Sequence, residues 1–82
     1  MKLSIIDTEK VVNYDVNWVE LNTSVGNMVI QEGHAPMIIE LSPGHEFLFE
    51  LAVTGEQKNI MITQGIAHIT RTEVKILIPL VV

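Results

Sequence analysis

Apolar and polar residues alternate with a period of two along most of this chain. The clearest stretch is residues 45–53, in which every second side chain is apolar: Phe47, Phe49, Leu51 and Val53. Such alternation is typical of a β-strand with one face on the core and the other toward solvent. No long window shows the i, i+3, i+4, i+7 spacing of an amphipathic helix. The pattern therefore predicts an all-β protein.

Turn residues divide the chain into short strands. Proline, glycine and serine separate the apolar stretches, as at Ser42-Pro43-Gly44. Gln64-Gly65 predicts a tight, hairpin-like connection between two of the strands. About eight to ten short, mostly antiparallel strands at this spacing indicate a small, flattened β-sandwich or barrel. The predicted strands cover residues 2–7, 15–21, 27–31, 37–41, 45–53, 59–63, 66–70 and 73–78.

The alternation changes phase within residues 15–21. Val16 and Trp18 share one face of the predicted strand, and Val19 and Leu21 then take the other. A β-bulge, or a strand covered on both faces, would produce this change. We expect Trp18 to contribute a large apolar area to the core, with a partner-binding anchor as the alternative.

Length, composition and charge narrow the class of function. The 82 residues are 48% hydrophobic, which suits one packed domain over residues 1–82. The net charge is −5 and the five Lys and Arg residues are scattered, which disfavours binding to nucleic acid or to anionic lipid. The chain has no cysteine, so disulfides and thiolate chemistry are excluded.

Neither membrane insertion nor secretion is expected from the sequence. The longest apolar run, residues 76–82, is far shorter than the roughly 20 residues that cross a bilayer. Asp7 interrupts the apolar residues at the N-terminus, which therefore lacks the apolar region of a signal peptide.

Few residues are candidates for chemistry. The three histidines, His34, His45 and His68, are at least eleven positions apart. We interpret each as a turn or surface residue with one hydrogen bond, and the alternative is a small cupin-like metal- or ligand-binding β-barrel that uses His45 and a nearby glutamate. Glu46 and Glu50 would be about 13 Å apart on one strand, too far for a paired-carboxylate site. No catalytic residue, cofactor or metal is predicted.

His34 has two interpretations. It lies in Gly33-His34-Ala35-Pro36, between two apolar strands. Its ring nitrogens could cap this turn, or the turn could be an exposed loop that touches a partner, because loops on a rigid β-scaffold often form contact sites.

Several landmarks occur in an order that resembles one known family. They are Met1–Ile6 followed by Thr8–Val12, then Gly26–Met37 with its Gly-His-Ala-Pro sequence, Ser42-Pro43-Gly44, Ile62–Ile69, and Glu73–Leu77. Together they resemble the β-sandwich domain of the epsilon subunit of F-type ATP synthases, from Met1 to about Ile78. The sequence departs from the family pattern at Asn27, Val29, Gln31-Glu32 and Gln64.

The resemblance implies a non-catalytic rotor subunit that couples rotation of the c-ring to the gamma subunit. Its partners would be gamma and the c-ring within the full complex, peripheral to the cytoplasmic side of the energy-transducing plasma membrane. Many family members continue into a two-helix C-terminal domain, which we expect to be absent here. Carried over by position, the ring-facing loop comprises Gly26, Asn27 and Met28, with Gly33, His34, Ala35 and Pro36 nearby.

Overall fold

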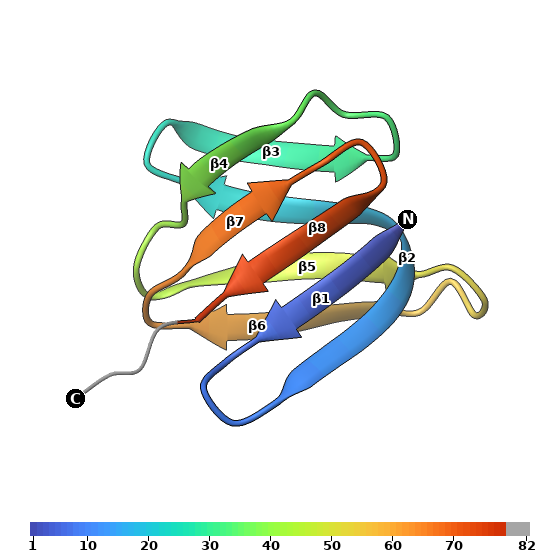
Figure 1. Cartoon of the computed structure of the whole chain (residues 1–82), viewed down its shortest axis with the longest axis horizontal. Helices are drawn as coiled ribbons and strands as arrows, with labels where there is room; N and C mark the ends of the chain where they lie inside the picture. Colours follow the sequence, from blue (N-terminus) through green and yellow to red (C-terminus); the bar gives the residue numbers. More distant parts are fainter. Residues whose placement is uncertain (79–82) are drawn as a thin grey trace.

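The protein is an all-β sandwich, as the alternation predicted. The computed structural model describes residues 1–78, which contain eight strands and no helix (Figure 1). The strands are β1 (Lys2–Ile6), β2 (Val11–Thr23), β3 (Gly26–Gln31), β4 (Met37–Glu40), β5 (His45–Leu51), β6 (Gln57–Ile62), β7 (Ile66–Ile69) and β8 (Glu73–Leu77).

Strand β2 belongs to both layers of the sandwich. Its first half pairs with β1, and its second half lies between β3 and β5. The first sheet therefore has the order β4-β7-β8-β1-β2, and the second sheet has the order β3-β2-β5-β6. In Figure 1 the strands of the first sheet cross in front of those of the second. Strands β1 and β8 run parallel, and the other described pairs are antiparallel.

A β-bulge marks the point where β2 passes from one sheet to the other. Val16 pairs with Leu51 and Trp18 pairs with Glu50, which leaves Asn17 as the extra residue. The predicted bulge is confirmed. Bulges bend a strand and increase its twist, which lets one strand serve two sheets.

Trp18 does not lie in the core, so the prediction for this residue is wrong. The extra residue is Asn17, so the alternation of inward and outward side chains changes before Trp18 and not after it. Val16, Val19 and Leu21 are all buried on the inner face, whereas Trp18 is half-buried on the outer face of the second sheet.

The core fills the space between the two sheets. Phe47 and Phe49 are buried there with ring centroids 6.1 Å apart, and Tyr14 packs 4.9 Å from Phe49. Val53 was expected on the same face but is 91% exposed, because β5 ends at Leu51 and the chain turns there. The remaining buried apolar residues are Leu3, Val16, Val19, Leu21, Ile30, Leu41, Ile62, Ala67, Ile69, Val74 and Ile76.

The connection at Gln64-Gly65 is short but does not form a hairpin. Strand β6 pairs with β5, whereas β7 pairs with β4 and β8, so the chain crosses here from the second sheet to the first. A Cβ on Gly65 would lie 3.1 Å from the Cδ1 atom of Ile62 and 3.2 Å from the backbone oxygen of Leu77. Close packing at this crossing, rather than hairpin geometry, therefore favours glycine, because a larger residue would force its neighbours to shift.

Candidate functional site

The connection between β3 and β4 carries the Gly-His-Ala-Pro sequence and is tied to the turn between β7 and β8. Gly33 has φ of +86°, a conformation that favours glycine. Its backbone N–H donates to the carbonyl oxygen of Arg71 at 2.7 Å, and the Arg71 Nη1 donates to the carbonyl oxygen of Gly33 at 3.3 Å. This pair of hydrogen bonds fixes the base of the loop. Sequence reasoning missed Arg71, because the two residues are 38 positions apart.

Within residues 1–78, His34 makes only local hydrogen bonds. Its backbone N–H donates to the carbonyl oxygen of Gln31 at 3.1 Å, and its Nδ1 lies 2.7 Å from the carbonyl oxygen of Ala35. A carbonyl oxygen can only accept, so Nδ1 carries the proton in this arrangement. The turn-capping interpretation therefore has a structural basis. Ala35 and Pro36 beside it are exposed.

The turn between β2 and β3 carries the other candidate residues. The Thr23 hydroxyl donates to the carbonyl oxygen of Gly26 at 2.7 Å, and the Asn27 Nδ2 donates to Asn22 Oδ1 at 3.1 Å. These bonds hold the turn from both sides. Gly26 and Asn27 are exposed, whereas Met28 is half-buried and packs against the core.

The two candidate segments do not lie near each other, and this corrects the sequence-based expectation. Gly26–Met28 begins β3, whereas Gly33–Pro36 follows its end (Figure 1). At about 3.3 Å per residue, a strand of this length separates them by roughly 20 Å. The seven residues therefore form two surfaces at opposite ends of β3.

The histidines are dispersed over the fold. His34 lies in the β3–β4 connection, His45 begins β5 in the second sheet, and His68 lies on β7 in the first sheet. Within residues 1–78, no three His, Asp or Glu side chains are grouped so that they could hold a metal ion. The geometry gives the cupin-like alternative no ligand set.

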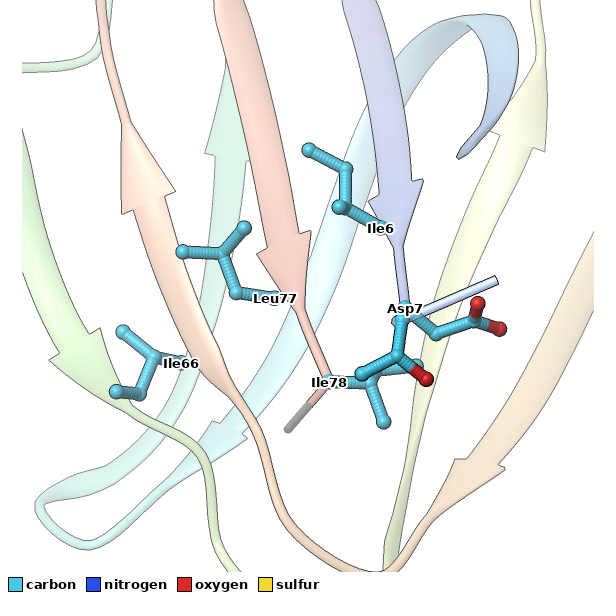
Figure 2. Close-up of a pocket in the computed structure, with 6 residues that line it drawn as sticks. Ile6, Asp7, Ile66, Leu77 and Ile78 are labelled. Atoms are coloured by element: carbon cyan, nitrogen blue, oxygen red, sulfur yellow. The ribbon is translucent and has the colours of Figure 1, made fainter. Parts of the chain in front are cut away.

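An open apolar pocket of about 220 Å³ lies on the outer face of the first sheet (Figure 2). It is lined by Ile6, Ile66, Leu77 and Ile78, together with Asp7 and Thr8 of the β1–β2 turn. Asp7 Oδ1 accepts hydrogen bonds from the backbone N–H groups of Glu9 at 2.7 Å and Lys10 at 2.8 Å. These bonds hold the pKa of Asp7 below its usual value of 3.8. The carboxylate therefore stays ionised and stabilises a turn.

Comparison with known families decides the assignment. The family described as ATP synthase, Delta/Epsilon chain, beta-sandwich domain matches residues 1–81. The chain belongs to the ATP synthase delta/epsilon family. This membership agrees with the resemblance seen in the sequence and with the all-β fold, and it does not favour the cupin-like alternative.

Two solved structures share the fold of this delta/epsilon-family chain. One is a chain of the Euglena gracilis mitochondrial ATP synthase, OSCP/F1/c-ring in rotational state 1, with TM-score 0.80, 22% identity, and coverage of 93% of this chain and 48% of that chain. The other is a chain of the Tetrahymena thermophila mitochondrial ATP synthase central stalk and c-ring, with TM-score 0.72, 16% identity, and coverage of 94% and 63%. The protein thus spans about half to two thirds of the length of these two chains.

No curated protein matches the sequence. Residues 1–78 contain no helix that is long and apolar enough to span a membrane.

Proposed function

We propose that this delta/epsilon-family chain is a non-catalytic rotor subunit of the central stalk of an F-type ATP synthase. In this role it couples rotation of the c-ring to the gamma subunit, and so to ATP synthesis, on the cytoplasmic side of the energy-transducing plasma membrane. The family match over residues 1–81 is the observation that carries the proposal. The similar Tetrahymena chain comes from a structure of the central stalk and c-ring, which supports it.

A coupling part must transmit force without deforming. Strand β2 is 13 residues long and continuous through both sheets, so it joins the two layers covalently. The core between the layers is one cluster of buried apolar side chains, and close-packed interiors have low compressibility and transmit strain. These properties suit a mechanical role.

The candidate residues divide into two contact surfaces in this proposal. Gly26, Asn27 and Met28 at one end of β3 would face the c-ring, with the exposed Gly26 and Asn27 making the contact. Gly33, His34, Ala35 and Pro36 at the other end would face gamma. A separation of roughly 20 Å allows one rigid domain to contact two partners at once.

Substitutions in the β3–β4 connection test this role. We expect His34→Ala and Pro36→Ala to reduce ATP-driven proton pumping by membranes that carry the variant, because each removes surface or order from the contact loop. The melting temperature of the domain should change little, since the three loop residues 34–36 lie outside the core.

Val53→Ala is the matched control, because Val53 lies in another turn and is 91% exposed. This variant should pump normally. Normal pumping by both loop variants would argue against the contact role of Gly33–Pro36.

A further inference from the structure

The outer face of the second sheet, called the acidic face below, combines a tryptophan with unpaired carboxylates. Trp18 lies on the central strand β2, opposite Gln31 on one side and Glu50 on the other. Glu20, two residues along β2, lies between Val29 and Leu48. The intervening Val19 points inward and is fully buried.

The carboxylates of the acidic face have no cation near them. Glu20, Glu46 and Glu50 form no ion pair within 4.0 Å among the described residues. Amide groups hold two of them instead: the Asn59 Nδ2 donates to Glu46 at 2.7 Å, and the Asn17 Nδ2 donates to Glu50 at 2.9 Å. A neutral amide fixes the position of a carboxylate but leaves its negative charge available to another molecule.

The basic residues of the described chain project elsewhere. Lys2 and Lys75 both pair with Glu73 in the first sheet, at 3.4 and 3.7 Å. Lys58 of the edge strand β6 lies opposite the inward-facing Phe49 and pairs with Glu56. Lys10 and Arg71 lie in turns between strands. The acidic face therefore carries three negative charges and no positive charge of its own.

The same face also presents apolar area. Trp18 and Leu48 are half-buried, Val29 is 48% exposed and Met61 is 61% exposed. Tryptophan and methionine are enriched in protein interfaces, and tryptophan near the centre of a contact is a frequent hot spot. Trp18 lies near the centre of the acidic face, because β2 has β3 on one side and β5 on the other.

The outer face of the first sheet lacks this charge asymmetry. Two lysines lie on this sheet and both pair with its carboxylate Glu73, so that the exposed Glu40 on β4 is not part of a cluster of unpaired carboxylates. The apolar pocket at Ile6, Ile66 and Leu77 has no feature that identifies what covers it. The unpaired negative charge beside exposed apolar area therefore selects the second sheet as the docking surface for a basic and apolar partner.

We infer that the acidic face docks a protein segment in which apolar side chains cover Trp18 and Leu48 while Lys or Arg side chains meet Glu20, Glu46 and Glu50. The identity of the partner rests on the proposed function, under which this basic and apolar segment belongs to the gamma subunit. The inference deepens that function by assigning the sheet face on which gamma packs.

Binding of the full-length protein to F1 complex from the same organism, stripped of this chain, tests the inference. We expect Trp18→Ala to weaken binding by about tenfold or more at every salt concentration. Glu20→Lys and Glu50→Lys should weaken it by about tenfold at low salt, with a smaller effect at high salt because charge interactions are screened. Glu20→Gln should weaken binding by about threefold and reduce its salt dependence.

Glu40→Lys is the matched control, since it reverses an exposed charge on β4 of the first sheet. It should change binding less than about twofold. Thermal melts identify any variant that does not fold, and Glu20→Gln then carries the test because it preserves the shape of the side chain.

The outcomes separate this inference from the proposed function. If the wild-type protein binds stripped F1 and the folded acidic-face variants bind equally well, the docking surface is wrong and the rotor role stands. An equal loss in Glu40→Lys would also overturn the assignment to the acidic face. If the wild-type protein binds no F1, the proposed function fails and the inference fails with it.

Discussion

Asp7 shows how a single exposed side chain can fix a turn in this protein. Its Oδ1 accepts two backbone hydrogen bonds, from Glu9 and Lys10, and its own backbone N–H donates to the carbonyl oxygen of Lys10 at 3.1 Å. The side chain thus mimics a turn of the backbone between β1 and β2. These bonds favour the ionised form and lower the pKa of Asp7.

The lowered pKa gives a prediction with a definite sign. A carboxyl group whose pKa is lower in the folded state stabilises the fold above its unfolded pKa, and this contribution is lost as the pH falls through the folded value. We expect Asp7→Ala to lower the melting temperature at pH 7 and to converge with the wild type well below pH 3.8, the usual Asp value. Calorimetry across this range measures the difference.

Glu9→Ala in the same turn is the control, because it keeps the backbone N–H that donates to Asp7, and its melting temperature at pH 7 should stay close to that of the wild type. A deficit of Asp7→Ala that stayed constant down to the lowest pH would contradict the role assigned to the carboxylate.

Trp18 shows where residue-level reasoning failed. The alternation revealed that the phase changes in this part of the chain, but it placed the change one step too late. One residue of error moves a side chain to the opposite face, because the period of a strand is two. The alternative interpretation of Trp18 as a binding anchor is the one that its half-buried position supports.

At the scale of elements, the sequence located all eight strands and missed mainly their ends. The largest miss is β2, which begins at Val11 rather than at residue 15. Asn13 and Asp15 are unfavourable in strands, so the pattern gave no strand signal here. The Ser4 hydroxyl donates to Asn13 Oδ1 at 2.8 Å and satisfies the amide oxygen within the β1–β2 pair.

The bulge at Asn17 gives an element-scale prediction. Deleting Asn17 would make Val16 and Trp18 adjacent, opposite Leu51 and Glu50. Every side chain of β2 would keep its present face, but the bend that lets β2 serve both sheets would be lost. We expect a loss of about 2–3 kcal/mol in the free energy of unfolding in urea denaturation, because a straighter β2 pairs less well with β1 and β3 at the same time.

Asn17→Ala separates the effect of the extra backbone residue from the effect of the Asn17 side chain. It removes only the exposed hydrogen bond to Glu50 and should cost about 0.5–1.5 kcal/mol. A deletion variant as stable as Asn17→Ala would show that β2 can serve both sheets without the bend at the bulge.

At the scale of the whole molecule, the pairing of the strands could not be read from local patterns. The parallel contact of β1 with β8 joins residues about 70 positions apart, and the β6–β7 connection resembles a hairpin in sequence but crosses between sheets. For the same reason the family resemblance named plausible contact residues without showing that they lie at opposite ends of β3. Long-range packing, rather than local propensity, decides these features.

In the proposed function the molecule is a rigid adaptor with three contact surfaces. The two ends of β3 would serve the c-ring and gamma, and the acidic face would extend the gamma contact over the second sheet. A small domain that buries more area against partners also gains stability from them, since binding to the folded state alone shifts the folding equilibrium.

The most direct test of the central claim is an affinity pull-down of the tagged full-length protein from its native membranes, read by mass spectrometry. The account predicts recovery of gamma, alpha, beta and c subunits in amounts that match an assembled ATP synthase. Recovery of the folded protein without any of these subunits would contradict it.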